Sequence, residues 1–193
     1  MMFERRAAMA TLLANRPKNL FVVPGLGSCT WDAFAAGDDD RNFYLWGAMG
    51  GAAMIGLGLA LAKPKVRVAV ITGDGEMLMG LGSLATIGVQ RPHNLAIVVF
   101  DNGLYGETGM QASHTQYGID MVGVAKACRF PETHSISQES ELAAARLLLH
   151  SGKGPVFIQA QVRQEEVARV LPSRDGNEIK LRFLEAVAKL DKV

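Results

Sequence analysis

Two short runs rich in β-branched and other apolar residues, 66–71 and 95–100, constrain the fold more than any other feature of the sequence. Neither run alternates apolar and polar residues as a strand with one solvated face does. Such runs are typical of strands buried on both faces, as in parallel sheets covered by helices. Segments with helical spacing lie between the runs. The alternation predicts an α/β fold, a three-layer sandwich with a mostly parallel central sheet.

The same patterns set the expected order of elements. Strands are expected at 20–23, 42–45, 66–71, 95–100, 134–136 and 155–162. Helices are expected at 4–15, after Gly51 to about residue 62, after Gly75, and near 120–128, 138–150 and 177–190. Because no internal repeat or low-complexity tract divides the chain, residues 1–193 are expected to form one domain.

Composition excludes several classes of function. Apolar residues make up 49% and charged residues 20%, which argues against disorder. The net charge of +1 provides no basic field for nucleic acid or an anionic membrane. The most apolar stretch, 47–62, has 16 residues and five glycines, fewer than the roughly 20 residues that span a bilayer.

The N-terminal segment and the cysteines indicate the cellular compartment. The first 14 residues carry Glu4, Arg5 and Arg6 and then mix small and large apolar residues, a pattern that favours an amphipathic helix over a signal peptide. Two cysteines, Cys29 and Cys128, are too few to hold a metal cluster alone. We therefore expect a reduced, cytoplasmic protein.

Two turn-forming motifs stand at the ends of the two apolar runs. Gly73-Asp74-Gly75 follows the first run and Asp101-Asn102-Gly103 follows the second. Each motif alone is a common tight turn. Asp74 and Asn102 are 28 residues apart, an interval that fits one helix and one strand. Adjacent parallel strands would bring both turns together at the strand carboxyl ends, where such sheets bind ligands.

The paired turns suit a magnesium–diphosphate ligand. Mg²⁺ prefers hard oxygen ligands, and here Asp74 supplies a charged oxygen and Asn102 a neutral one. Gly73 and Gly75 let the backbone approach phosphates without a Cβ in the way. The amides that open the following helix can hold a diphosphate. Two structural turns without a ligand are the alternative.

This pair resembles the thiamine diphosphate enzymes, which carry Gly-Asp-Gly and, one helix and one strand later, Asn-Asn. Asp101 replaces the first Asn, and Asn102 retains the second. The resemblance implies thiamine diphosphate and Mg²⁺ as cofactors, with the side chains of Asp74 and Asn102 and the backbone carbonyl of Leu104 as metal ligands. It covers residues 20–162. The stretch from Asp101 onward is similar to small two-chain sulfopyruvate decarboxylases and their phosphonopyruvate-acting relatives.

The segment 46–51, Trp-Gly-Ala-Met-Gly-Gly, has two interpretations. Glycines permit close helix packing, and a methionine commonly fills a core gap. The resemblance implies instead that Met49 is the side chain over which the cofactor bends, which makes it catalytic. The Gly47 carbonyl would then accept a hydrogen bond from the 4′-amino group, with Ala48 also in contact. The bend matters because proton transfer requires hydrogen-bond distance.

The loop that follows Asn102 holds further candidates. Glu107 and His114 are either solvated loop residues or proton relays on a loop that closes over the reacting carbon. Tyr105, at the start of the loop, is expected to contact the cofactor because the resemblance continues through it. The loop from Asn102 to about Tyr117 is expected to be flexible.

A glycine-containing loop, 25–30, follows the first strand. A dinucleotide-binding turn is disfavoured there, since the third glycine is missing and no clear helix follows. The resemblance implies that Ser28 and Thr30 contact the diphosphate. Glu76 is expected to contribute its amide while its carboxylate points away, because a carboxylate would repel a diphosphate.

The resemblance implies a subunit rather than a complete enzyme. Full-length relatives contain a second domain that binds the pyrimidine and supplies a glutamate to ring N1′, and 193 residues leave no room for it. We therefore expect a partner (alpha) subunit with a pyrimidine domain, in a hetero-oligomer. The expected activity is that of a thiamine diphosphate-dependent carboxy-lyase, active only with this partner, which decarboxylates a small 2-oxo acid non-oxidatively to an aldehyde.

Three alternatives remain open from the sequence. A carboligase would share every early step of the reaction. The beta subunit of a 2-oxo acid:ferredoxin oxidoreductase would pass electrons to iron–sulfur clusters, which would have to lie on a partner. A non-enzymatic reading is a degenerate cofactor-binding or scaffold module, and the retained pair Asp74 and Asn102 counts against it.

Overall fold

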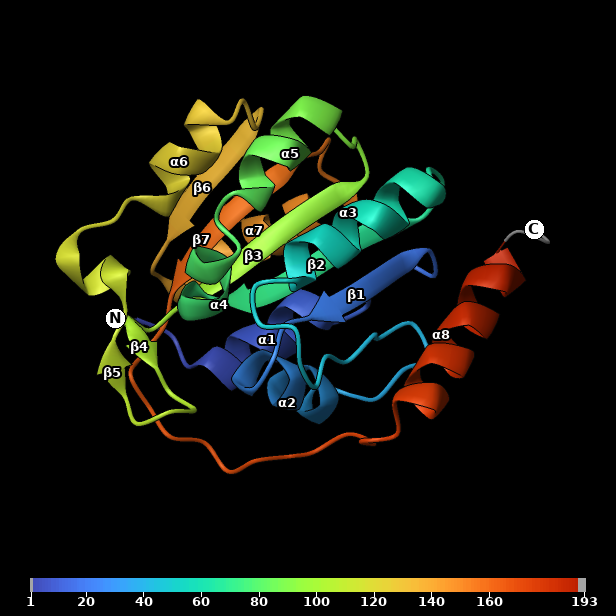
Figure 1. Cartoon of the computed structure of the whole chain (residues 1–193), viewed down its shortest axis with the longest axis horizontal. Coiled ribbons are helices and arrows are strands. Elements are labelled where there is room, and N and C mark those ends of the chain that lie inside the picture. The colour runs from blue at the N-terminus through green and yellow to red at the C-terminus, as the bar shows by residue number, and fades with distance from the viewer. Residues whose placement is uncertain (1, 191–193) are drawn as a thin grey trace.

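A central parallel sheet of five strands organises the computed structural model of the chain, which describes residues 2–190 (Figure 1). Its strand order is β1-β2-β3-β7-β6, and all four pairings are parallel. A short antiparallel hairpin, β4–β5, stands apart. The strands are β1 (Leu20–Pro24), β2 (Arg67–Gly73), β3 (Leu95–Asp101), β4 (Leu104–Tyr105), β5 (Gln111–Ala112), β6 (Glu132–Ile136) and β7 (Val156–Gln161).

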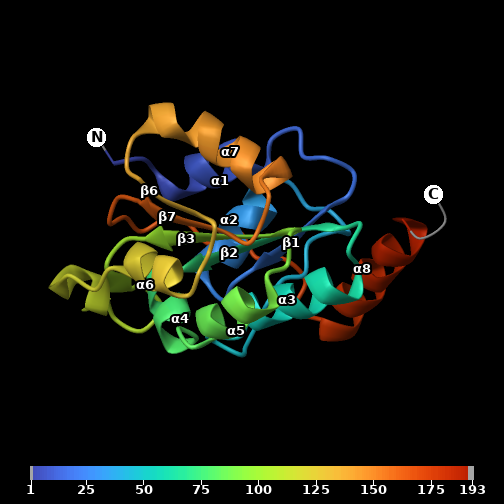
Figure 2. The ribbon, with the colours of Figure 1, turned by 90° about the horizontal axis from the view of Figure 1, so that it is seen from above.

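Helices cover both faces of the sheet (Figure 2). One face carries α1 (Arg5–Leu13), α2 (Ser28–Ala35) and α7 (Leu142–Ser151). The other carries α3 (Ala52–Ala62), α4 (Asp74–Met79), α5 (Ser83–Gln90) and α6 (Met121–Ala127), with α8 (Gly176–Leu190) beyond β1. Two 3-10 helices are η1 (His114–Tyr117) and η2 (Glu139–Glu141). The predicted three-layer sandwich is confirmed.

The sheet separates two apolar cores because successive strand residues point to opposite faces. In β1, Leu20 and Val22 enter the core shared with α1, α2 and α7. Phe21 and Val23 enter the core shared with α3, α5 and α6. All four side chains are fully buried. Burial on both faces explains why the strand runs are almost continuously apolar.

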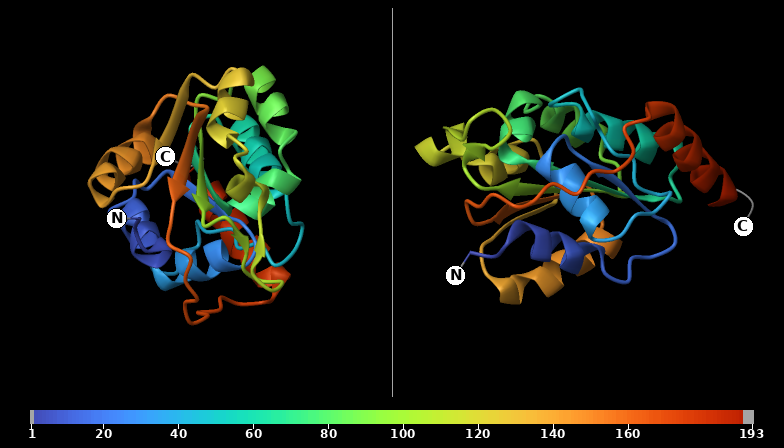
Figure 3. Two further views of the ribbon diagram at one scale, coloured as in Figure 1. Left: turned by 90° about the vertical axis from the view of Figure 1, so that its left-hand side faces the viewer. Right: turned by 90° about the horizontal axis from the view of Figure 1, so that it is seen from below.

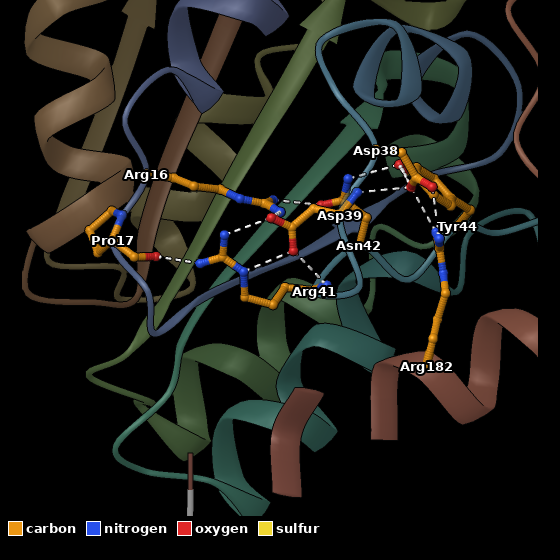
Figure 4. Close-up of polar contacts among 8 residues, drawn as sticks. All are labelled: Arg16, Pro17, Asp38, Asp39, Arg41, Asn42, Tyr44 and Arg182. Atoms are coloured by element: carbon orange, nitrogen blue, oxygen red, sulfur yellow. Dashed lines mark hydrogen bonds and ion pairs between the residues drawn. The ribbon is translucent and has the colours of Figure 1, made fainter. Parts of the chain in front are cut away.

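The expected strand at 42–45 is wrong. In the described chain, one isolated bridge, Val22–Asn42, joins this segment to the sheet. Side-chain contacts hold this segment in place. Asp38 accepts hydrogen bonds from Arg182 of α8. Asp39 accepts hydrogen bonds from Arg41 and forms an ion pair with Arg16. These contacts fix the path that leads to residues 46–51. The network comprises Arg16, Pro17, Asp38, Asp39, Arg41, Asn42, Tyr44 and Arg182 (Figure 4).

Two further expectations about helices are corrected. The loop 25–30 does lead into a helix, α2, which begins at Ser28. The helix expected after Gly75 is two helices, α4 and α5, interrupted at residues 80–82. The interruption coincides with a close approach of two backbones, because a Cβ on Gly80 would lie 2.2 Å from the carbonyl oxygen of Gly50.

Candidate cofactor site

A cavity of about 490 Å³ opens at the carboxyl ends of β1, β2 and β3. Residues that follow three different strands form its walls, so distant parts of the chain meet there. Ten of the candidate residues from the sequence line it: Ser28, Met49, Gly73, Asp74, Gly75, Glu76, Asn102, Leu104, Tyr105 and Glu107. The predicted convergence of the two turns is therefore present in the structure.

Asp74 is a buried carboxylate that lines this cavity, with a residue exposure of 2%. The Ser113 hydroxyl donates a short hydrogen bond to its Oδ2, and the Thr115 hydroxyl lies 3.4 Å from the same atom. Burial raises the pKa of Asp74 to about 6, against the lowering effect of the Ser113 hydrogen bond. A cation at this carboxylate would offset the cost of its burial.

Asn102 and Leu104 belong to the second turn, which follows β3. The Leu104 N–H donates to Asn102 Oδ1 at 2.9 Å, which places the amide oxygen beside the backbone at residue 104. Both residues line the cavity together with Asp74. A carboxylate, an amide oxygen and a backbone carbonyl are hard oxygen donors, as Mg²⁺ prefers.

The residues present therefore fit a magnesium ion that shares its coordination with phosphate oxygens. Among the described residues, no group of three or more His, Cys, Asp or Glu side chains could hold a metal by itself. Mg²⁺ is commonly bound through one or two carboxylates plus phosphates of a ligand, so it needs no such group.

Asp101, where the resembling enzymes have Asn, supports the turn rather than the cavity. Its Oδ1 accepts hydrogen bonds from the Gly103 N–H at 3.0 Å and the Thr115 hydroxyl at 2.8 Å. Its Oδ2 accepts one from Gln159 of β7 at 2.6 Å. Three donors around one carboxylate give a physical reason for the acidic residue at this position.

Glu76 lies at the cavity wall with its carboxylate directed at the loop between β1 and α2. Its Oε2 accepts hydrogen bonds from the Leu26 N–H and the Thr72 hydroxyl, each at 2.9 Å. A Cβ on Gly25 would lie 2.0 Å from this oxygen, so the loop approaches Glu76 through a glycine. Burial raises the pKa of Glu76. The side chain thus fixes the loop, while the role expected for its amide stays a prediction.

The turn at 46–51 contacts α4 closely, as the packing interpretation predicts. Ala48 and Gly50 have positive φ angles of 58° and 91°, and the turn rests on Gly80. Met49 of this turn and Met79 of α4 both line the cavity. Gly47 and Ala48 are exposed and do not line the cavity. Their contacts with the cofactor, and the role of Met49 beneath it, stay predictions.

Two further candidates, Thr30 and His114, also do not line the cavity. Thr30 is fully buried, and its hydroxyl donates to the Gly25 carbonyl at 2.8 Å, so it holds the loop in shape instead of meeting a ligand. His114 is exposed at the start of η1 and does not line the cavity. Its neighbours Ser113 and Thr115 turn inward to Asp74. In this loop, the two hydroxyl residues Ser113 and Thr115 were therefore the sequence feature that pointed to the site.

The segment 163–175, between β7 and α8, was missed by the sequence reasoning. It runs along the edge of the molecule past α2, as the views of Figure 1 and Figure 3 agree. Glu165, Glu166, Val167 and Arg169 of this segment line the cavity. The segment is polar and lacks periodicity, so no pattern predicted that it would contribute to a site.

Arg169 links the segment to two other walls of the cavity. Its guanidinium lies 4.8 Å from the centroid of the Trp31 ring on α2. It also forms an ion pair with Glu107 at 3.5 Å, and Glu107 accepts a hydrogen bond from the Ser28 hydroxyl at 3.1 Å. Glu107 therefore joins the loop after β3, α2 and the segment 163–175 at the mouth of the cavity.

Of the helices in residues 2–190, none has both the length and the apolar character needed to cross a bilayer.

Comparisons with known proteins agree with this geometry. The chain is 38% identical over 159 residues to phosphonopyruvate decarboxylase of Streptomyces viridochromogenes, covering 82% of this chain and 40% of that protein. It is 34% identical over 178 residues to sulfopyruvate decarboxylase subunit beta of Methanocaldococcus jannaschii, covering 92% of this chain and 94% of that protein. The chain thus spans less than half of the phosphonopyruvate decarboxylase and nearly all of the beta subunit.

A solved structure shares the fold. Benzoylformate decarboxylase from Polynucleobacter necessarius matches with a TM-score of 0.68 and 24% identity, over 85% of this chain and 34% of that one. Residues 26–160 match the family described as thiamine pyrophosphate enzyme, C-terminal TPP binding domain. This match contains both Gly73-Asp74-Gly75 and Asp101-Asn102, and Asp74 and Asn102 of these motifs line the cavity. The chain therefore belongs to the family of C-terminal TPP binding domains of thiamine pyrophosphate enzymes.

Proposed function

We propose that the chain is the thiamine diphosphate-binding subunit of a two-chain 2-oxo acid decarboxylase. The observation that carries this proposal is the meeting of Asp74, Asn102 and Leu104 at one cavity. Near full-length similarity to a sulfopyruvate decarboxylase beta subunit supports a subunit of this kind. Similarity to phosphonopyruvate decarboxylase supports a small 2-oxo acid with a second acidic group as the substrate class.

The residues of the cavity divide the work of binding. The side chains of Asp74 and Asn102 and the carbonyl of Leu104 would hold Mg²⁺ against the diphosphate. Ser28 and Cys29 of the first turn of α2 also line the cavity, and the amides at a helix N-terminus could hold a phosphate group there. Bound thiamine diphosphate would supply the carbon nucleophile that makes loss of CO₂ from a 2-oxo acid possible. Met49 would orient the two rings of the cofactor.

Close packing at Gly75 positions one more wall. A Cβ on Gly75 would lie 2.5 Å from Tyr105 Cε1, so the Tyr105 ring rests directly on the backbone of the metal turn. The ring and Leu104 form an apolar side of the cavity. An apolar side limits the access of water to the reacting carbon.

A partner subunit with a pyrimidine-binding domain is part of the proposal. Two methionines that line the cavity are exposed, Met49 by 38% and Met79 by 61%. Exposed apolar side chains that gather beside a site are typical of a protein interface. The partner would cover these side chains and complete the cavity. The proposed function involves neither nucleic acid nor a membrane. The protein would act in the cytoplasm.

Calorimetric titration with Mg²⁺ and thiamine diphosphate tests the metal assignment. Asp74→Ala should abolish Mg²⁺-dependent binding while circular dichroism stays unchanged, because Asp74 supplies the charged metal ligand. Asp101→Asn is the matched control, since it changes the neighbouring carboxylate that faces the turn, and it should retain binding. An unaltered affinity in Asp74→Ala would contradict the proposal.

A further inference from the structure

Arg5 is a buried cation at the cavity wall. It is the first residue of α1, and the bridge between Phe3 and Val162 sets the start of α1 beside the end of β7. Its side chain is only 7% exposed, yet the residue lines the cavity. Its backbone N–H donates to Glu165 Oε1 at 3.1 Å, which fastens the segment 163–175 to α1.

One carboxylate orients this arginine. Asp32 of α2 is fully buried, and its Oδ2 accepts a hydrogen bond from Arg5 Nε at 2.5 Å. The other oxygen, Oδ1, accepts one from Arg6 Nε at 2.9 Å. Two guanidinium groups therefore share a single carboxylate, and the trio keeps a net positive charge. Arg6 sends its remaining contact to the Ala168 carbonyl and does not line the cavity.

The terminal nitrogens of Arg5 are left available. Within residues 2–190, neither Nη atom makes a hydrogen bond, and Asp32 is the only carboxylate within ion-pair distance of the guanidinium. Neither Nη atom is among the unpartnered polar atoms that are sealed from solvent. The Nη atoms therefore keep contact with solvent although the side chain is only 7% exposed, and the cavity is the open space that the residue lines. Donors held in this way can exchange water for the oxygens of a ligand.

We propose that Arg5, held by Asp32, binds an oxyanion inside the cavity through its two Nη atoms. The planar guanidinium matches carboxylate and phosphate oxygens with two parallel hydrogen bonds. The anion is either a phosphate of the diphosphate or an acidic group of the 2-oxo acid. Its identity rests on the proposed function, whereas the existence of the anion site rests on the geometry of Arg5 alone.

The test compares Arg5→Gln with Arg6→Gln as the matched control. Both variants lose one hydrogen bond to Asp32, but only the first removes a donor from the cavity. Asp32 keeps one arginine in each variant, so both should fold, which thermal unfolding verifies. Binding of Mg²⁺–pyrophosphate and of Mg²⁺–thiamine diphosphate is followed by calorimetry and by the fluorescence of Trp31, which lines the cavity.

If the anion is the diphosphate, Arg5→Gln weakens the binding of both pyrophosphate and thiamine diphosphate about 10- to 100-fold, which is the effect of losing hydrogen bonds to a charged group. Arg6→Gln then binds like the wild type. If the anion belongs to the substrate, cofactor affinity is unchanged in Arg5→Gln, and KM for the 2-oxo acid rises by a similar factor in the enzyme completed by its partner. Wild-type affinities and KM in folded Arg5→Gln would overturn the inference.

A second variant covers the case in which Arg5→Gln does not fold. Arg5→Lys keeps the cation for Asp32 but lacks the two-nitrogen fork, so it should still weaken binding of the anion severalfold. Wild-type values in Arg5→Lys would also overturn the inference. The proposed function is tested separately. If the wild type binds pyrophosphate through Arg5 but does not bind thiamine diphosphate, the proposed function is contradicted and the anion site is still supported.

Discussion

Gly80→Ala provides a quantitative test of the contact between α4 and the turn at 46–51. The added Cβ would lie 2.2 Å from the Gly50 carbonyl oxygen and 3.1 Å from the Gly50 carbonyl carbon, whereas ordinary contact begins at 3.4 Å. The turn would have to move by about 1 Å, since a backbone atom cannot rotate away as a side chain can. Overpacking of this kind costs about 1–3 kcal/mol.

Gly82→Ala is the matched control two residues further along. Nothing lies within 4 Å of a Cβ on Gly82, and its φ of −60° suits any residue. Alanine there should be neutral or stabilising by about 0.4–1 kcal/mol, because it reduces the freedom of the unfolded chain. Urea unfolding should therefore rank Gly80→Ala below Gly82→Ala by more than about 1 kcal/mol.

The displaced turn should also affect the site, because it carries Met49. In the folded Gly80→Ala variant, the affinity for thiamine diphosphate, measured by calorimetry, should change little. Turnover with the partner subunit should fall by a larger factor. Equal stability of Gly80→Ala and Gly82→Ala, together with unchanged turnover, would refute the packing argument.

Three further predictions address the site and the loop network. Met49→Ala should lower turnover far more than cofactor affinity, while Met54→Ala, which is exposed but outside the cavity, should not; a structure with Met49 far from both cofactor rings would contradict this. Because burial raises the pKa of Asp74 to about 6, Mg²⁺ affinity should fall about tenfold per pH unit below pH 6 and level off above it. The pH dependence of Mg²⁺ binding to free thiamine diphosphate corrects for titration of the diphosphate, and a corrected affinity that does not change with pH would exclude Asp74 as the titrating ligand. The hydrogen bonds from Arg41 and Arg16 outweigh burial and lower the pKa of Asp39, so its stabilising effect is full above the ordinary aspartate pKa and is lost as the pH falls. The stability difference between wild type and Asp39→Asn in urea should therefore shrink below about pH 4, and a difference independent of pH would count against the ion pairs.

The strands and the metal turns could be predicted because their signals are local. Each β-branched run reflects burial on both faces of the sheet, and each run ends directly in a turn motif. The interval between Asp74 and Asn102 was expected to hold one helix and one strand, and in the structure it holds two helices, α4 and α5, and the strand β3. Leu104 was predicted from the family resemblance alone; its N–H donates to Asn102 Oδ1, and its role as a metal ligand stays a prediction.

The parts that could not be predicted depend on contacts between distant residues. From the sequence alone, Arg5 is expected to be a charged residue on the exposed side of a helix. Its contacts with Asp32 and with Glu165, 160 residues away, hold it at the cavity instead. The segment 163–175 has no periodic pattern to mark it. α2 was missed because Thr30 and Asp32, polar residues, occupy its buried side. Sequence periodicity assigns such positions to the surface.

The central claim is that this chain supplies the thiamine diphosphate-binding half of a decarboxylase that a partner completes. The decisive measurement is the release of CO₂ from sulfopyruvate, phosphonopyruvate and pyruvate by the purified chain with Mg²⁺ and thiamine diphosphate, alone and with the pyrimidine-domain subunit. Loss of a well-placed proton-transfer group commonly costs about 10²- to 10⁴-fold. The chain alone should therefore remain at background, and the partner should restore decarboxylation of one of these acids or a related 2-oxo acid. Rapid CO₂ release by the verified pure chain alone would contradict the account.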